Sequence, residues 1–362
     1  MNRTTKRQHA AALDVRRHQV TRGWLGDFRG DQARRLAATR ALFDEPVVII
    51  DPHTHSEHSD GNAPVAANHA VAAAAGIDIL FATDHGSLGQ KRDIRARTGA
   101  SWGQEPGALH HHIGLLCNTR LFKPRRDRLD LDIARARRLA PFVWIPHPAG
   151  WYPGTVYSEE QKAALWTLAP AFAMEVLNGA HHIGTAFDRF DEAAVALWDR
   201  LLADGIRVTP LGGSDAHIPE SIGCCWTAVP DARPTAASVI EGLNAGRCLA
   251  SEGPLLALWI EGRPMGSDIR AGPGKRVRVR FRAADAAGLQ CVRLVADGRA
   301  VKTVWPRDAA VVEEELMFAP GRACSLRLEA RAVDNRRAFA APLYFARQAD
   351  ARDRGGDNEC DR

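Results

Sequence analysis

The sequence predicts an α/β fold with parallel strands, followed by a smaller all-β domain with sandwich-like patterning. Short apolar runs rich in β-branched residues alternate with helical stretches from residue 47 to about 251. Beyond residue 253 the helical stretches give way to strand patterns, and 362 residues are too many for one ordinary core. We therefore expect four segments: a helical extension over 1–46, an α/β domain over 47–253, a β domain over 254–347, and a disordered polar tail over 348–362.

The elements follow from local patterns. Residues 31–43 space their apolar side chains as a helix does, behind Asp31 as a candidate cap. In the α/β domain, apolar runs predict strands over 47–50, 77–83, 113–117, 142–145, 172–177 and 206–211, and the stretches between them predict helices over 64–76, 161–169 and 191–205. In the β domain we expect strands over 276–283, 291–304, 311–318 and 324–333, with a hairpin turn at Asp297 and Gly298.

Composition excludes several classes of protein. The net charge is +5, and 42 of the 48 basic residues are arginines that are spread among acids, so no nucleic-acid partner is expected. The basic stretches at 123–128 and 134–138 fit solvated faces better than an anion site. No segment approaches the roughly 20 apolar residues of a membrane span, and the first 20 residues lack a signal peptide. We expect a cytoplasmic protein without a membrane partner, whose seven cysteines are reduced.

Histidines gather at the ends of the predicted strands. Twelve of the fourteen lie between residues 53 and 217. Because active sites of parallel α/β folds lie at the carboxyl ends of strands, residues far apart in the chain can converge there. Those next to predicted strand ends are His53, His55, His85, His112 and His147, with Asp215 and His217 after the sixth run.

Neutral imidazoles and carboxylates together are what a divalent metal ion requires. His53 and His55 are two residues apart in an extended segment, so both rings can reach one ion. An HxH pair alone is weak evidence, since such histidines often make ordinary hydrogen bonds. Histidines or carboxylates at the ends of five strands are a much stronger signal, and they predict a metal centre.

The motifs that carry these residues resemble a known family. DPHTHSEHSDG, ATDHG, GQEPGALHHH, IPHP, MEVLNG and GGSDAH occur in this order. They are similar to the motifs of the polymerase and histidinol phosphatase (PHP) family of metal-dependent hydrolases. The β-rich segment after ASEGPLLAL resembles the CehA/McbA branch, which includes carbaryl hydrolase. The resemblance covers residues 47–347, and it implies a distorted (β/α)7 TIM-like barrel with two or three divalent ions (zinc, manganese or iron) at the strand ends.

The resemblance also implies a ligand set. The first ion would be held by His53, His55, Glu105 and Asp215, the second by Glu105, His112 and His147, and the third by Asp60, His85 and His217. The run of three histidines at 110–112 leaves the register open; we choose His112, seven residues after Glu105. In the third site His58 is an alternative to Asp60.

The expected chemistry is hydrolysis of a small-molecule ester by activated water. Asp215 would take up or orient the proton of the attacking water, and His217 or His85 would assist the leaving group. We favour a phosphoester, since three ions suit a dianion; a carboxylic or carbamate ester, as in carbaryl hydrolase, is the alternative. A non-catalytic metal-binding module is less favoured, because structural zinc sites usually use cysteine and no proposed ligand is one.

Some neighbouring residues keep two interpretations. Asp51 and Asp84 could orient ligand rings, although Asp51 could equally hold backbone at the strand end. Glu175 is expected to be buried and paired beside the site. For His181, His182, Trp151 and Tyr152 we weigh a place in the pocket against ordinary loop packing.

Overall fold

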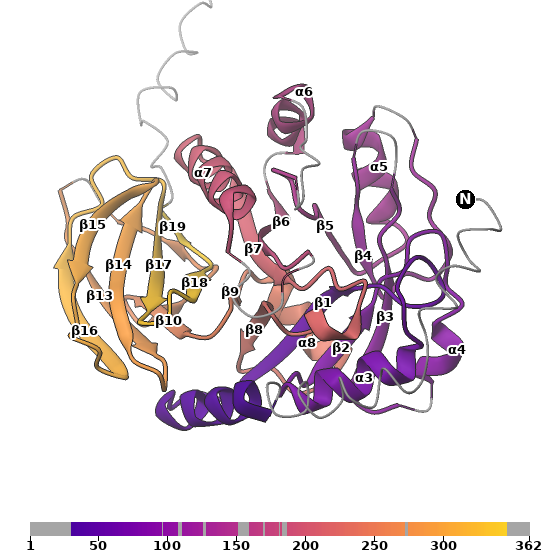
Figure 1. Cartoon of the computed structure of the whole chain (residues 1–362). Coiled ribbons are helices and arrows are strands. Elements are labelled where there is room, and N and C mark those ends of the chain that lie inside the picture. Colours follow the sequence, from indigo (N-terminus) through magenta and orange to yellow (C-terminus); the bar gives the residue numbers. More distant parts are fainter. Residues whose placement is uncertain are drawn as a thin grey trace, which may run out of the picture.

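The structure is a computed structural model that describes residues 30–345, apart from 96, 108–110, 126–127, 151–158, 169–170, 181, 183–186 and 272–273. The predicted tail and the predictions for His110, Trp151, Tyr152 and His181 fall outside the described residues. An α/β part and a β-rich part lie side by side, with α7 between them (Figure 1).

The α/β part contains each strand that the apolar runs predict. Its first seven strands are β1 (Val47–Thr54), β2 (Ile79–Ala82), β3 (Ala100–Gln104), β4 (Gly114–Leu116), β5 (Phe142–Trp144), β6 (Ala171–Asn178) and β7 (Arg207–Gly213). The helices are α3 (Val65–Ala74), α4 (Lys91–Ile94), α5 (Leu129–Ala136), α6 (Glu159–Ala163), α7 (Arg189–Ala203) and α8 (Ala236–Asn244). Strand β3 was not predicted, because its sequence ASWGQ is not an apolar run.

The strands are mostly, not wholly, parallel. β1, β2 and β3 pair in parallel, and so do β6 and β7. The expectation of an all-parallel arrangement is wrong for β4, which runs antiparallel to β3 and β5. The chain returns from β3 to β4 within nine residues, and that is too short for the crossover that parallel pairing needs. Strand β8 (Trp226–Pro230) is also antiparallel to β1.

Two isolated parallel bridges link the ladders. Ile145, just after β5, pairs with Met174 in β6. Thr54, at the end of β1, pairs with Ala216, just after β7. Backbone hydrogen bonds support both links, from Ile145 N to Ala173 O (2.8 Å) and from His55 N to Ala216 O (2.9 Å). Each strand from β1 to β7 is therefore linked to the next by a ladder or a bridge, and β7 is linked back to β1.

The β-rich part forms two groups of strands. One is a four-stranded sheet in the order β11-β10-β13-β16. The other contains β14, β15, β17, β18, β19 and β12. The predicted hairpin joins β14 to β15, and Asp297 (φ 44°) and Gly298 (φ 78°) have the left-handed backbone of its turn. The strands are β10 (Leu255–Ile260), β11 (Arg263–Pro264), β12 (Asp268–Ile269), β13 (Val277–Ala284), β14 (Leu289–Ala296), β15 (Arg299–Val304), β16 (Val311–Phe318), β17 (Ser325–Ala332), β18 (Arg337–Ala340) and β19 (Leu343–Phe345).

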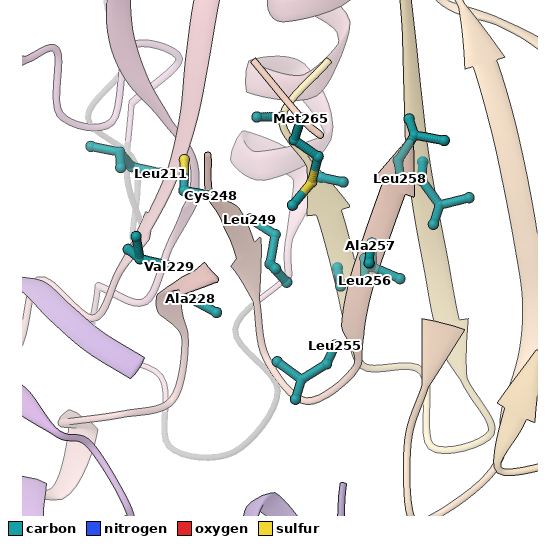
Figure 2. Packing of buried hydrophobic residues seen from close by; sticks show 14 of the residues in the cluster. Leu211, Ala228, Val229, Cys248, Leu249, Leu255, Leu256, Ala257, Leu258 and Met265 are labelled. Carbon is teal, nitrogen blue, oxygen red and sulfur yellow. The ribbon is translucent and has the colours of Figure 1, made fainter. Parts of the chain in front are cut away.

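The two parts share one hydrogen-bonded sheet and one apolar core. Strand β9 (Leu249–Ser251) pairs with β8 on one side and with β18 on the other. Figure 2 shows the core at this junction, where Leu211 and Val229 of the α/β part lie near Leu249, Leu256 and other side chains of the segment that leads into the β-rich part. The chain around residue 253 is thus packed structure and not a flexible linker.

The helix over residues 30–42 also joins the two parts (Figure 1). Arg35 pairs with Asp285 of the β-rich part (2.7 Å), whereas Arg40 pairs with Asp78 of the α/β part (2.5 Å). Leu36 is buried in the shared core. The predicted helix is therefore present, and it packs against both parts.

Two further expectations can be compared with the structure. None of the six cysteines that the structure describes forms a disulfide, and Cys360 lies outside the described residues. Within the described ranges, no helix has the length and apolar character needed to span a bilayer.

Candidate metal centre

All nine predicted ligands lie together; His112 precedes the antiparallel strand β4 and so lies at its amino end. The nine ligands form three overlapping groups of three or four residues. Within each group, every residue offers one ligand atom, and these atoms lie within 4.8 Å of one another. We call these the first, second and third groups. Their members are His53, His55, Glu105 and Asp215; Glu105, His112 and His147; and His55, Asp60, His85 and His217. The third group contains His55 in addition to the three residues that were predicted.

The first group has the dimensions of a metal site. His53 Nε2 lies 3.2 Å from His55 Nε2 and 3.3 Å from both Glu105 Oε2 and Asp215 Oδ1. His55 Nε2 lies 3.4 Å from Glu105 Oε2 and 3.1 Å from Asp215 Oδ1. Four ligands at about 2.0–2.1 Å from a tetrahedral zinc ion are separated by about 3.3 Å. The four atoms thus already have the spacing of ligands around one ion.

The tautomer of His53 strengthens this reading. Its Nδ1 lies 2.7 Å from Glu175 Oε1, and an ionised carboxylate only accepts hydrogen bonds. In a neutral ring Nδ1 therefore carries the proton, and Nε2 is left with a lone pair. That lone pair faces two carboxylate oxygens, which are acceptors as well. Acceptors that converge on one point, in a buried place, fit a cation between them.

The second group is built on the other oxygen of Glu105. His112 Nδ1 and His147 Nε2 lie 2.7 and 2.8 Å from Glu105 Oε1. These are hydrogen-bond distances, so the rings would move by a few tenths of an ångström to admit an ion. Glu105 is 1% exposed, and its two oxygens face two different groups. This arrangement is the one that a bridging carboxylate requires.

The third group lies nearer to solvent. Asp60 Oδ2 lies 3.3 Å from His85 Nε2 and 3.4 Å from His217 Nε2. Both distances are longer than the roughly 2.7–2.9 Å of a charged hydrogen bond. Both rings point Nδ1 at a backbone carbonyl, that of Glu105 (2.8 Å) for His85 and that of Asp215 (2.9 Å) for His217. The carbonyls fix the protons on Nδ1, so both Nε2 atoms can serve as ligands.

Two buried polar atoms at the third group have no hydrogen-bond partner among the described residues. They are His55 Nδ1 and Asp60 Oδ1, which are 3.7 Å apart. A buried polar atom without a partner is costly. An ion bound between these residues would satisfy the Asp60 oxygen, so the donor set fits a third metal.

Electrostatics favour positive charge throughout the centre. Burial by itself lowers the pKa of His85, but the hydrogen bond to Asp60 and the charge of Glu105 raise it to about 10. Burial opposes the charge of Glu105, yet His112 and His53 hold its pKa well below the usual value. The carboxylates therefore stay ionised and attract either protons or metal ions to the imidazoles.

Local backbone conformation aims the ligands. Asp215 (φ 49°) and His147 (φ 31°) both have left-handed backbone, which is uncommon for residues other than glycine and is often found at functional sites. A side chain on Gly213 would lie 2.8 Å from Cβ of His53 and 3.1 Å from Glu175 Oε1. Glycine at the end of β7 thus lets that strand approach the ligands closely.

The residues around the ligands match the sequence expectations only in part. Glu175 is buried and paired, as expected, and accepts hydrogen bonds from Trp144 Nε1 and His147 N as well as from His53. Asp51 accepts from the backbone of Ser214 (3.0 Å), so of its two interpretations the strand-end one is correct.

For three neighbouring side chains the structure excludes a role at the ligands that the sequence had left open. Asp84 bonds to Ser56 N and Oγ (both 2.8 Å) and orients no ligand ring, because it points into the turn that follows β1. His58 does not replace Asp60, since its Nε2 lies 2.7 Å from Asp93 Oδ2 outside the centre. His182 lies 3.4 Å from Asp188 at the start of α7.

Sequence reasoning missed Asn178, at the end of β6. Its amide donates to Glu175 Oε2 (2.9 Å) and to Asp215 Oδ2 (3.3 Å) and so connects the carboxylate behind the first group to one within it. Its position in the MEVLNG motif was the available signal. The register of the histidine run is consistent with the choice of His112, because His111 turns away to Asp132 (3.2 Å).

Comparison with known proteins gives one family match and several structural likenesses, two of which follow. The chain is similar to a two-domain protein from Bacteroides vulgatus ATCC 8482, described as containing a predicted PHP-like metal-dependent phosphoesterase, with 18% identity over 83% of this chain and 96% of that one and a TM-score of 0.41. It is also similar to PsfC from Pseudomonas syringae PB-5123, with 18% identity over 54% and 87% and a TM-score of 0.39. Likenesses this distant carry no argument about fold or function.

The comparison with curated proteins finds no match. The family match is short and includes part of the centre. Residues 200–248, which hold the ligand candidates Asp215 and His217, match the PHP-associated (PHP_C) family model.

Proposed function

We propose that this chain is a metal-dependent hydrolase of the PHP family, from its CehA/McbA-like branch, and that it cleaves a small-molecule phosphoester. The observation that carries the proposal is the first group, in which four buried candidate ligand atoms lie 3.1–3.4 Å from their neighbours in the group. The family match over residues 200–248 agrees with it.

The barrel belongs to this proposal as well. The ladders and bridges that lead from β1 through β7 and back to β1 support a distorted (β/α)7 barrel in which β4 is reversed. We propose that the barrel part extends over 47–253 and that the β domain covers 254–347. In such a barrel the ligands would ring one mouth.

The proposed ligands are those of the three groups. His53, His55, Glu105 and Asp215 would hold one ion, Glu105, His112 and His147 a second, and Asp60, His85 and His217 a third. Nitrogen and oxygen ligands without cysteine suit zinc, manganese or iron. Divalent ions bound there would lower the pKa of a bound water towards about 7 and polarise the bond under attack.

The chain's own residues then handle protons. Asp215 is 5% exposed, and its Oδ2 lies 3.3 Å from Asn178 Nδ2 and 4.0 Å from His147 Nε2, so it can orient or accept the proton of the attacking water. His85 and His217 have side chains that are 30% and 24% exposed. When the third ion is not bound, their Nε2 atoms are available, and either ring can assist the leaving group.

Charge supports the choice of a phosphoester. A cleft beside the centre is lined by His85, His112, Phe122 and Lys123. Two or three dications and the lysine would make this cleft strongly positive, and a phosphate dianion suits that better than an uncharged ester does.

The test is metal analysis followed by a panel of substrates. Protein expressed with zinc, manganese or iron should hold two to three equivalents per chain, and chromogenic phosphate mono- and diesters should be cleaved faster than carboxylic and carbamate esters. If the protein cleaved carbamate esters faster than phosphoesters, the proposed substrate class would be wrong, but the proposal of a metal-dependent hydrolase would stand. Bound metal with no cleavage of any ester would favour a binding module, and less than one equivalent would refute the metal centre.

A further inference from the structure

A second hollow lies on the β-rich part, and none of the nine ligand candidates lines it. It is formed on the sheet of β14, β15, β17 and β18. The side chains that matter here are three arginines and a tryptophan, Arg293, Arg331, Arg337 and Trp305, with Cys291 and Thr303 beside them. Three cations in one hollow need an explanation.

The strand register brings two of these arginines together. Arg331 of β17 stands directly opposite Arg337 of β18, and Cys291 of β14 stands opposite Arg331 on its other side. Directly opposite residues project from the same face of a sheet about 5 Å apart. Like charges in that position destabilise the sheet. The pair therefore costs stability unless something else compensates for it.

The nearby carboxylates are already occupied. Glu329 pairs with both Arg293 and Arg327, and Arg327 also pairs with Asp199 of α7 (2.8 Å). Among the described residues, the guanidinium groups of Arg331 and Arg337 form no hydrogen bond or ion pair. These two guanidinium groups thus have no carboxylate in direct contact among the described residues, although the charges of Glu252, Glu192 and Glu329 act on Arg337 from further away.

The Arg337 side chain is held in place despite this. Its guanidinium stacks over the ring of Phe187, 3.8 Å from the ring centre, and its Nε is buried without a hydrogen-bond partner. Burial first, and then the charge of Arg331, lower the pKa of Arg337. A rigid, partly desolvated guanidinium beside a second one is prepared for an anion, which can accept hydrogen bonds from both.

The rim adds an aromatic surface. Trp305 is 65% exposed and is the most exposed large apolar side chain among the described residues. Because the indole ring of Trp305 is so exposed and lies beside arginines, an aromatic ring of a ligand can stack against it. We propose that this hollow binds a small aromatic anion, with its carboxylate or phosphonate group between Arg331 and Arg337 and its ring against Trp305. The proposal is independent of the hydrolase and needs no metal.

Calorimetric titration tests it on the full chain after treatment with EDTA, so that the metal centre does not bind the probe. We expect phenylphosphonate and benzoate to bind at one equivalent per chain, inorganic phosphate more weakly, and benzyl alcohol not at all. Benzoate and phenylphosphonate distinguish a carboxylate ligand from a phosphoryl one. Absence of binding by both aromatic anions up to 10 mM, a concentration about tenfold above a weak Kd of 1 mM, would overturn the proposal.

Variants locate the site and separate binding from folding. Arg331→Gln should weaken phenylphosphonate at least tenfold, whereas Arg278→Gln, an exposed arginine of β13, should not. Without ligand, Arg331→Gln should also raise the melting temperature, because it removes the like-charge pair. If Arg331 had only a structural role, the same substitution would lower the melting temperature. Trp305→Ala should weaken phenylphosphonate more than phosphate. Unchanged binding in Arg331→Gln would refute the assignment, even if the protein binds the probe elsewhere.

Discussion

Replacing Glu105 with glutamine should disable the proposed centre while leaving the fold in place. The side chain keeps its volume, but both oxygens lose their charge and one becomes an amide nitrogen. In the structure, Oε1 faces His112 and His147, and Oε2 faces His53 and His55 at 3.3 and 3.4 Å. Whichever way the amide turns, its NH₂ group points at the place proposed for one ion.

The size of the effect follows from the burial of this carboxylate. Removing one partner of a buried, hydrogen-bonded charge pair costs about 2–5 kcal/mol. Because 1.4 kcal/mol corresponds to a factor of ten, the affinity for one metal ion should fall by roughly 30-fold to several thousand-fold. Metal ions contribute several kcal/mol to the transition state, so the hydrolysis rate should fall by about 10²–10⁴.

The assay is metal content by elemental analysis, together with turnover of the best ester from the panel. Glu241→Gln makes the same chemical change at an exposed carboxylate that belongs to no candidate metal group among the described residues, and it should alter neither quantity. Far-UV circular dichroism would show that both variants are folded. If folded Glu105→Gln kept its metal content and its turnover, the bridging role would be wrong.

Three further predictions concern the support of the centre and the shared fold. Glu175→Gln should weaken metal binding by about 10–100-fold, because the carboxylate that orients His53 is lost. Competition with a chromogenic chelator measures the affinity, and Glu241→Gln, at an exposed position, is the control. Unchanged affinity in Glu175→Gln would contradict the prediction. A fragment ending at Gly253 should be insoluble or unfolded, since β9 loses β18 and the core of Figure 2 is cut open; a soluble fragment with native circular dichroism and full metal content would show that the α/β part stands alone. Titration of denatured, unreduced protein should find close to seven thiols, and finding five or fewer would indicate a disulfide.

The nine candidate ligands could be grouped from the sequence because the signal is local. A ligand next to a strand end can be recognised without knowing which strands are neighbours, and parallel neighbours then bring those ends together. Glu105 is a partial exception, because β3 was not predicted and the resemblance alone pointed to that residue.

The remainder depends on long-range pairing. An apolar run such as the one in β4 shows that a strand is buried, but it does not show in which direction the strand runs. The pairing of β9 with β18 joins residues about 90 positions apart, and nothing in either short strand indicates the other. For the same reason the helix over 30–42 was expected to be an appendage, although Arg35 reaches Asp285.

The pairing of β9 with β18 has a consequence for synthesis on the ribosome. When Ser251 has been added, β9 can pair with β8, but its other edge must wait for residues 337–340. At about 5–20 residues per second, that wait lasts roughly 4–18 seconds. During this time an unpaired strand edge and the apolar side chains around Leu249 are open to other chains. Rare codons or pauses between residues 253 and 337 should therefore increase aggregation, and chaperones that bind nascent chains should have most to protect in this interval.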